Sequence, residues 1–438
     1  MIITKKITLT GLFIFVYLIV SPNLVGHLLC SCRKPQPFPL QIKDPNLNIA
    51  LKEYYENFVS SKNALKLKSI EITSDYGIRS IEGIDAFRNL EELTITDNQI
   101  VDLSPLKKLK KLRYLDLSHN RIPEIAALGE LNEIAHLSLW HNEIASIACL
   151  RKLTSLEELD LRENKLKSLE GIGFLSHLRF LSVDGNPSLD WHSAEKNLSV
   201  ADLSAAGVPI PEIGLLNPFP NILAIRLMGC ELTSLKGIES FARLEVVDVS
   251  NNRLATLSHL GKCDKIKSLD VSANPVEDWQ ALAGLPALTE LTAWGIPSPD
   301  PAVIGRLRSL RNLSIIGAGM EDCSFAAGLI NLEVLDLSEN RITDLTPLST
   351  LKNLQSLGID RNRIQSLGPL IGLPNLIFLS AEENQIRDIS DILQFRCVNA
   401  KHGKIIVNIK LSGNHDLKVS EGLAKRLQAL KDKVIVSW

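Results

Sequence analysis

The apolar residues between Leu90 and Cys397 recur every 22 residues through fourteen consecutive copies. In the copy from Leu332 to Asn353, apolar residues occupy positions 1, 4, 6, 11, 14, 17 and 20, and asparagine occupies position 9. Positions are counted from the first residue of each copy, so that Leu90 and Leu112 both stand at position 1. A fixed period of this size predicts a solenoid, in which each repeat buries its apolar face against its neighbours.

Each copy divides into a strand and a return segment. Leu335 and Leu337 alternate with Asp336 and Ser338, so one pair faces a core and the other faces away, which predicts a short strand. The return segment has apolar residues three apart, a spacing that favours a tight 3₁₀ or irregular turn over a long α-helix. In the same copy these residues are Ile342, Leu345, Leu348 and Leu351.

Asparagine at position 9 stands where the chain leaves the strand, and it occurs in ten of the fourteen copies. Its amide can donate to and accept from backbone groups of adjacent turns, which would otherwise be buried without partners. Val208, Cys230, Ile296 and Ala318 replace it in the other copies. We therefore expect altered curvature or a weakened stack at two places along the array.

The pattern L-x-x-L-x-L-x-x-N-x-I-x-x-L resembles the leucine-rich repeat family, in the short form of bacterial internalins and of the regulatory phosphatase subunits in the same repeat class. The resemblance covers about four-fifths of the chain. It implies an α/β solenoid in the shape of a horseshoe, with a parallel β-sheet on the concave face, short 3₁₀ or irregular turns on the convex face, and helical caps at both ends.

The first residues have the features of an export signal. Lys5 and Lys6 precede an apolar stretch from Ile7 to Val20, which at 14 residues is short for a membrane span. The sequence Leu29-Cys30-Ser31-Cys32 resembles the lipobox of bacterial lipoproteins, which implies a signal peptide over residues 1–31 and a lipid on Cys32. Cys30 is the competing site, although Leu29 is large for the position before it. An ordinary secreted product and an uncleaved anchor are the alternatives.

The remaining chain divides into a tether, two caps and the repeats. Residues 32–45 are rich in proline, which predicts an extended tether. A helical N-terminal cap is predicted over residues 46–66, because they follow the helix start signal Asp44-Pro45-Asn46. Residues 67–414 hold about 16 repeats. Residues 415–438 predict a C-terminal cap with a helix over 420–431 and a strand over 434–436.

Four irregularities interrupt the regular count. The first repeat has one extra residue near Asp75, and the register shifts by eight residues between Val398 and Ile406. In the copies that start at Leu178 and Leu288 the return segments lose the apolar pattern, and we expect loosened outer edges there.

Composition and motifs exclude several functions. The net charge is −2, without the basic excess that nucleic-acid binding requires. No phosphate-binding loop, nucleophile elbow or zinc-protease motif occurs, so we expect no enzyme activity, metal or cofactor. Cys230, Cys263 and Cys323 fall on core positions and predict apolar filling. His119 and His141 occupy the same position in successive copies, about 5 Å apart, and a solvated strand face explains them better than a metal site.

Positions 3, 5, 7 and 8 of successive copies are expected to tile the concave face, where a partner can dock on aligned side chains. Exposed aromatic and arginine side chains dominate binding hot spots. One group comes from four consecutive copies, and a second group lies further along. The first comprises Tyr114, His119, His136, Trp140, His141, Arg162 and Phe180, and the second Met228, Val246, Trp294 and Ile316.

Together these patterns predict a non-catalytic, monomeric binding scaffold. We expect it to be exported and lipid-anchored at the outer membrane or cell surface, or alternatively secreted, and to bind a protein or peptide, with a glycan as a further option. Adhesion or a host or envelope interaction is the leading function. The alternative is a regulatory or docking subunit of an enzyme complex.

Overall fold

The structure is a computed structural model that describes residues 41–56, 63–297, 299–395, 407–429 and 434–437. The predicted signal peptide, the lipobox and most of the predicted tether lie outside these residues. Within them, no helix combines the length and the apolar character that a membrane span requires.

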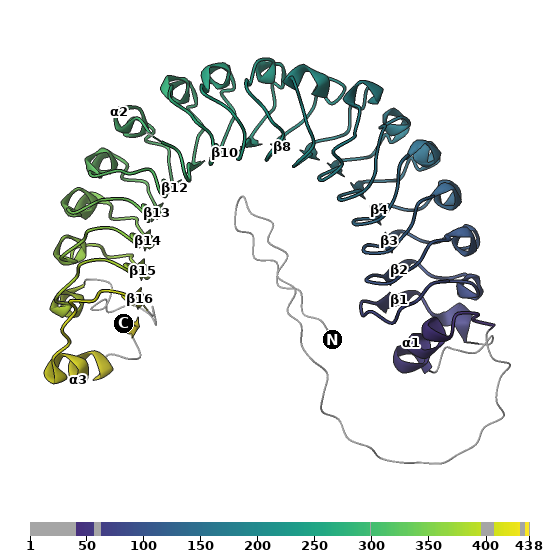
Figure 1. The fold of residues 1–438 in the computed structure, drawn as a ribbon, viewed down its shortest axis with the longest axis horizontal. Helices are drawn as coiled ribbons and strands as arrows, with labels where there is room; N and C mark the ends of the chain where they lie inside the picture. Colours follow the sequence, from purple (N-terminus) through teal and green to yellow (C-terminus); the bar gives the residue numbers. More distant parts are fainter. Residues whose placement is uncertain (1–40, 57–62, 298, 396–406, 430–433, 438) are drawn as a thin grey trace, which may run out of the picture.

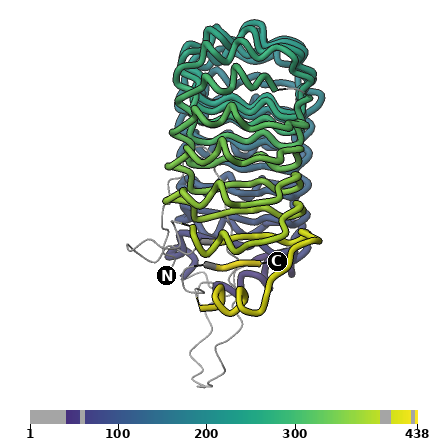
Figure 2. The backbone as a smooth tube through the Cα atoms, turned by 90° about the vertical axis from the view of Figure 1, so that its left-hand side faces the viewer, coloured from purple at the N-terminus to yellow at the C-terminus, as the bar shows by residue number. Residues whose placement is uncertain are grey.

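The described chain is an arch with a single parallel sheet along its inner side and short helical turns along its outer side (Figure 1). Each strand pairs with the next strand in the chain, and the side view shows the turns stacked as a coil (Figure 2). The strands are β1 (Ser69–Ile72), β2 (Glu92–Ile95), β3 (Tyr114–Asp116), β4 (His136–Ser138), β5 (Glu158–Asp160), β6 (Phe180–Ser182), β7 (Asp202–Ser204), β8 (Ala224–Arg226), β9 (Val246–Asp248), β10 (Ser268–Asp270), β11 (Glu290–Thr292), β12 (Asn312–Ser314), β13 (Val334–Asp336), β14 (Ser356–Gly358), β15 (Phe378–Ser380), β16 (Val407–Lys410) and β17 (Val434–Ser437).

Three segments are α-helical and the other outer turns are 3₁₀ helices, as the three-residue apolar spacing predicts. The α-helices are α1 (Pro45–Tyr55), α2 (Pro301–Ile304) and α3 (Glu421–Ala429). The 3₁₀ turns are η2 (Ala64–Lys66), η3 (Ile84–Ala86), η4 (Ser104–Lys108), η5 (Ala126–Glu130), η6 (Ala148–Lys152), η7 (Ile172–Phe174), η8 (Trp191–Ser193), η9 (Ile213–Leu216), η10 (Ile238–Ser240), η11 (Ser258–Lys262), η12 (Gln280–Gly284), η13 (Ser324–Gly328), η14 (Thr346–Thr350), η15 (Gly368–Leu370) and η16 (Ser390–Gln394).

The strand register follows the sequence period. From β2 to β15 each strand residue pairs with the residue 22 positions later, as Tyr114 pairs with His136. Ser69 in β1 pairs with Glu92, one residue beyond the period, which confirms the extra residue in the first repeat. Phe378 pairs with Asn408, eight residues beyond the period, which confirms the register shift before β16.

The asparagines at position 9 form a ladder of side-chain bonds between repeats. In the example of Asn142, the amide nitrogen donates to the carbonyl oxygens of Leu117 and Leu139, both at 3.0 Å, and the amide oxygen accepts from the Ile122 N–H at 3.0 Å. Asn414 makes the same contacts after β16, beyond the fourteen regular copies. This asparagine ladder satisfies backbone groups that are buried between the strands and the return segments.

The ladder is interrupted where the sequence predicts. At the first interruption the thiol of Cys230 contacts the Ala205 carbonyl oxygen at 3.0 Å, in place of an asparagine amide. Parallel pairing nevertheless continues, since Asp202 pairs with Ala224 there and Glu290 pairs with Asn312 at the second interruption. A change of curvature or a weaker stack at these two places stays a prediction.

Position 8, directly before the ladder residue, has a left-handed backbone in all fourteen copies, with φ between +50° and +70°. Sequence reasoning missed this feature. Each copy that lacks the asparagine carries glycine here, and glycine adopts this conformation without the strain that other residues incur. The residues are Asp97, His119, His141, Glu163, Gly185, Gly207, Gly229, Asn251, Ala273, Gly295, Gly317, Glu339, Arg361 and Glu383.

A second, exposed set of side-chain bonds joins repeats along the edge where the strands begin. The amide nitrogen of Asn353, at position 22, donates to the Ile330 carbonyl oxygen of the previous repeat at 3.0 Å. Asn331 and Asn375 make equivalent bonds at the same position. The repeats are therefore joined at two levels, one buried and one open to water.

Asp44 joins the N-terminal helix to the first repeat. One carboxylate oxygen of Asp44 accepts from the N–H groups of Asn46 and Leu47 and caps α1, while the other accepts from Arg79 and Ser80. Burial acts to raise the pKa of Asp44, but these backbone bonds lower it below its ordinary value. At the other end, β17 extends the sheet by pairing in parallel with β16.

The two return segments that lack the apolar pattern form short helical turns, and a looser outer edge there stays a prediction. In the copy from Leu178 the return segment forms η8, whose Trp191 is buried and whose Asp190 caps the turn through the His192 N–H. In the copy from Leu288 it forms α2, where Asp300 caps the helix and Pro301 occupies its first turn. In both segments an aspartate cap stabilises the turn although the apolar pattern is missing. Its carboxylate accepts hydrogen bonds from N–H groups at the start of a short helical turn, which would otherwise be free.

Replacing Asn340 by alanine should lower the free energy of unfolding by about 1–3 kcal/mol, because buried backbone groups lose their partners. The Asn340 amide donates to Ile315 at 2.7 Å, and its oxygen accepts from Met320 at 3.0 Å. Urea denaturation followed by circular dichroism measures the change. The control is Asn353→Ala, which removes an exposed bond and should have a much smaller effect. Equal losses in both variants would contradict a special role for the buried ladder.

The left-handed residue at position 8 gives a second test of how each repeat is held together. Gly207 has a φ of +70° and its added Cβ would meet no atom within 4 Å, so Gly207→Ala changes only backbone strain. We expect a loss of about 1–2 kcal/mol in the free energy of unfolding. Gly422 in α3 also has open space around an added Cβ. Gly422→Ala should be neutral or stabilising by up to about 1 kcal/mol, and an equal loss there would contradict the strain argument.

Candidate binding surface

The concave sheet carries an aromatic and cationic cluster over β3 to β5. His119 and His141 follow β3 and β4 at position 8, and their rings stack with centroids 4.7 Å apart at 26°. This distance agrees with the spacing expected from their places in neighbouring strands. The left-handed backbone at both residues places the two imidazoles side by side.

Trp140 lies within this cluster. Its ring meets the His119 ring edge-on at 4.4 Å, and the guanidinium carbon of Arg162 lies 4.6 Å from its centroid. Aromatic and cation–π contacts of this kind hold a side chain in one orientation. Trp140 lies on the concave side as its register predicts, but its neighbours leave it only half exposed.

Arg162 and the three histidines of the cluster each lie near a carboxylate. Arg162 binds Asp160 through two nitrogens at 2.9 and 2.6 Å, a pairing that raises the pKa of Arg162. His141 Nδ1 lies 2.7 Å from a Glu163 oxygen, and this hydrogen bond lowers the pKa of Glu163. His136 Nδ1 likewise lies 3.0 Å from Glu158, while His119 Nδ1 is 4.0 Å from Asp97. These contacts hold the side chains of the cluster in one arrangement.

The structure brings together six of the residues proposed from the sequence. Tyr114 and His136 are paired neighbours at position 3 with ring centroids 6.2 Å apart, next to the residues already described. Phe180 lies further along the sheet, opposite Glu158, and Trp294 lies after β11 and is 55% exposed. We call the six residues Tyr114, His119, His136, Trp140, His141 and Arg162 the N-terminal cluster.

Sequence reasoning missed the role of Asp184, at position 7 after β6. One carboxylate oxygen accepts from the Ser204 hydroxyl and from the Ala206 N–H, both at 2.7 Å. Burial raises the pKa of this carboxyl above its ordinary value, although both hydrogen bonds oppose the shift. The recurring aspartate and serine letters on alternating positions were the available signal.

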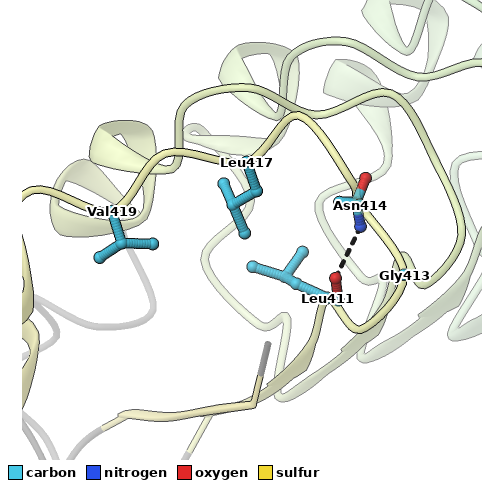
Figure 3. A pocket seen from close by; sticks show the side chains of 5 residues that line it. All are labelled: Leu411, Gly413, Asn414, Leu417 and Val419. Carbon is cyan, nitrogen blue, oxygen red and sulfur yellow. Dashed lines mark hydrogen bonds between the residues drawn. The ribbon is translucent and has the colours of Figure 1, made fainter.

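The described residues hold no cluster of metal ligands. No three His, Cys, Asp or Glu side chains in that part of the chain come together as a metal site would require. A pocket of about 230 Å³ lies at the C-terminal end, and no ionisable side chain lines it (Figure 3). Its lining residues are Leu411, Gly413, Asn414, Leu417 and Val419.

Comparison with known protein families agrees with the fold. A family model for leucine-rich repeats, in the form of two copies, matches residues 88–130, 134–173 and 330–371. These segments match leucine-rich repeats, and the described residues fold as a leucine-rich repeat solenoid. No curated protein sequence that was compared with this chain matches significantly.

Solved structures of bacterial leucine-rich repeat proteins have the same fold. A protein from Leptospira interrogans is 23% identical, with a TM-score of 0.65, over 86% of this chain and 97% of that chain. The internalin InlF from Listeria monocytogenes is 22% identical, with a TM-score of 0.51, over 82% of this chain and 96% of that chain.

The functional domain of the internalin InlJ, also from Listeria monocytogenes, is 18% identical, with a TM-score of 0.59, over 84% of this chain and 81% of that chain. That domain is described as including a cysteine ladder. The present chain has a ladder of asparagine instead, with the single thiol of Cys230 at one interruption. At these identities the likeness concerns the fold alone.

Asp184 provides a test through pH. Its folded pKa is raised above the unfolded value, so ionisation costs stability at neutral pH, and this cost disappears as the pH falls through the folded pKa. Asparagine can accept the same two hydrogen bonds without a charge. Asp184→Asn should therefore raise the melting temperature at about pH 7 and lose this advantage at about pH 3.

The matched control for Asp184 is Asp202→Asn, which removes an ion-pair partner of Arg226 on a neighbouring strand. This variant should bring no gain in melting temperature at neutral pH. A lower melting temperature for Asp184→Asn under the same conditions would show that the buried charge stabilises the fold and would refute the assignment.

Proposed function

We propose that this protein is a non-catalytic scaffold that binds a macromolecule through its concave face. The observation that carries the proposal is the fixed geometry of Trp140 between His119 and Arg162. Side chains already held in one conformation lose little freedom on binding, and tryptophan and arginine are the residue types that dominate hot spots.

The extent of the concave face favours a large partner. Fourteen strands spaced about 4.8 Å apart cover roughly 60 Å along the sheet, far more than a small molecule can span. The pocket described above lies at the C-terminal end, away from the N-terminal cluster, and protein or peptide surfaces suit a wide exposed sheet better than small ligands do. We take a protein or peptide as the partner, with a glycan as the alternative.

The proposal includes export and attachment to a membrane. The charged and apolar segments before Cys32 support an export signal, and Cys32 is the acylation site that we favour. The proline-rich tether over residues 32–45 would span up to about 45 Å if extended, enough to hold the scaffold away from a lipid surface. Adhesion or an interaction within the cell envelope fits this placement at an outer membrane or cell surface.

The partner-binding role is tested by Trp140→Ala. A partner is first captured from envelope extracts of the source cells with the immobilised wild-type protein, and its affinity is then measured by isothermal titration calorimetry. We expect a loss of about 2 kcal/mol or more in binding free energy, because a hot-spot side chain is removed. Calorimetric melting should show only a minor loss of stability.

The matched control for Trp140 is Phe174→Ala. Phe174 is an exposed aromatic side chain of η7 on the outer side of the arch, and the guanidinium of Arg151 lies over its ring at 4.7 Å. This variant should bind the partner as the wild type does. Equal losses of affinity in both variants, or unchanged affinity in Trp140→Ala, would contradict binding at the N-terminal cluster.

The anchoring role is tested by intact-mass analysis of membrane-extracted protein from a bacterial host. We expect a mature N-terminus at Cys32 with the added mass of acyl chains, and Cys32→Ser should lack that mass and leave the membrane fraction. Cys30→Ser serves as the control and should be processed normally. An unmodified, freely released wild-type protein would contradict the anchor and leave a secreted binder.

A further inference from the structure

The concave sheet has a second apolar region, over β8 to β13, that no described segment covers. Met228 and Trp294 stand at position 7 after β8 and β11 and are 47% and 55% exposed. Val334 at position 3 of β13 is 40% exposed, and Val246 and Ile316 are half-buried. Large apolar side chains grouped on one face of a sheet indicate a contact surface.

Aspartates run between these apolar residues along position 5. The last residues of β9, β10 and β13 are Asp248, Asp270 and Asp336. The five apolar side chains stand at positions 3 and 7, two positions before or after position 5, on these and nearby strands. Asp248 and Asp270 are directly paired in the register of β9 and β10, so two like charges lie on adjacent strands, about 5 Å apart at their backbones. We call these three aspartates and the five apolar residues the central patch.

The one arginine at position 5, Arg226, stands beside Asp248 in the register of β8 and β9, but its guanidinium binds Asp202. Asp248 and Asp270 accept hydrogen bonds from the N–H groups of Ser250 and Ser272, and Asp336 does so from Ser338, but no ion pair of the described residues includes them. Burial raises the pKa of Asp270, and the charge of Asp248 adds to the shift. Negative charge at the central patch is therefore incompletely compensated within the described part of the chain.

This condition differs from that of the N-terminal cluster, where Arg162 and the three histidines each lie near a carboxylate. It also extends over the concave face, because positions 3, 5, 7 and 8 of the fourteen copies hold sixteen acidic residues and three arginines. With a net charge of only −2, the excess of negative charge is concentrated on this face. The acidic residues are Glu92, Asp97, Asp116, Glu158, Asp160, Glu163, Asp184, Asp202, Asp248, Asp270, Glu290, Asp336, Glu339, Asp360, Glu382 and Glu383, and the arginines are Arg162, Arg226 and Arg361.

We propose that the central patch binds a cationic segment of a protein partner, in which lysine or arginine side chains alternate with apolar ones. The inference rests on the proposed function and specifies the chemistry of the partner. Charge complementarity selects this occupant, because a cation placed between Asp248 and Asp270 would relieve their repulsion while Trp294 and Met228 take up apolar side chains. Nucleic acid is excluded by the same negative charge.

The size of the patch sets the length of a probe. Five strand spacings of about 4.8 Å from β8 to β13 amount to roughly 24 Å, which about seven extended residues span. A suitable probe is a fluorescein-labelled peptide of about ten residues with alternating arginine and leucine. Its control is the same peptide with citrulline in place of arginine, which keeps the shape and removes the charge.

Fluorescence anisotropy with the full-length protein at low salt, about 50 mM, measures binding of both peptides. The arginine peptide should bind more tightly than the citrulline peptide, with an affinity that falls as salt is added. The triple variant Asp248→Asn, Asp270→Asn, Asp336→Asn should weaken binding on the order of tenfold or more, because asparagine keeps the hydrogen bonds to serine but removes the charges. Trp294→Ala should weaken it as well.

The matched control removes the same charge away from the concave positions. Glu124, Asp264 and Glu277 are exposed and belong to no ion pair of the described residues. The triple variant Glu124→Gln, Asp264→Asn, Glu277→Gln should leave the affinity for the arginine peptide within about twofold. Equal weakening in both triple variants would show a general effect of net charge and overturn the inference.

Failure of the inference is distinguishable from failure of the proposed function. If the concave triple variant binds the arginine peptide as the wild type does, or if both peptides bind equally, the central patch does not select cations. The effect of Trp140→Ala on the captured partner is measured independently, so the scaffold role can stand when the cationic ligand is refuted. A peptide effect confined to the concave triple variant supports the inference.

Discussion

The structure depends on how the chain leaves each strand. At that point the backbone turns through a left-handed residue at position 8 and exposes N–H and carbonyl groups to the interior. The asparagine at position 9 satisfies groups in its own repeat and in the preceding one, as Asn142 does for Leu139, Leu117 and Ile122. Because one buried side chain serves neighbouring turns, the repeats stay in register, and the positions of the concave side chains follow from that register.

The register gives the concave face two regions with different chemistry. At the N-terminal cluster Trp140 is held between neighbours, and Arg162 and His141 contact carboxylates, so these side chains are held in one arrangement. At the central patch Asp248 and Asp270 lie side by side outside any ion pair of the described residues, next to exposed apolar side chains. One region offers a fixed shape to a partner and the other offers uncompensated charge, a combination suited to a ligand that extends along the sheet.

The apolar period and the position-9 asparagine predicted the parallel sheet, the 3₁₀ turns, the extra residue of the first repeat and the shift before β16. These features follow from which side chains must be buried and from the number of residues between them, and the sequence contains both. The left-handed position escaped prediction, since His119 and Glu163 carry no side-chain signature of that backbone. The short helical turns of the two irregular return segments also escaped prediction, because Asp190 and Asp300 act as caps only once the turn has formed. The partial burial of Trp140 by its neighbours also escaped prediction, because it depends on side-chain conformations that the 22-residue period does not determine.

The account is tested most directly by hydrogen–deuterium exchange of the full-length protein, measured by mass spectrometry. The ladder forms three runs, Asn98 to Asn186, Asn252 to Asn274 and Asn340 to Asn414, separated by the copies that lack asparagine. If the ladder holds the stack together, peptides around Ile144 and Leu254, whose N–H groups donate to ladder asparagines, exchange slowly. Faster exchange should mark the copies with Val208, Cys230, Ile296 and Ala318. Uniform protection across all fourteen copies would contradict the account.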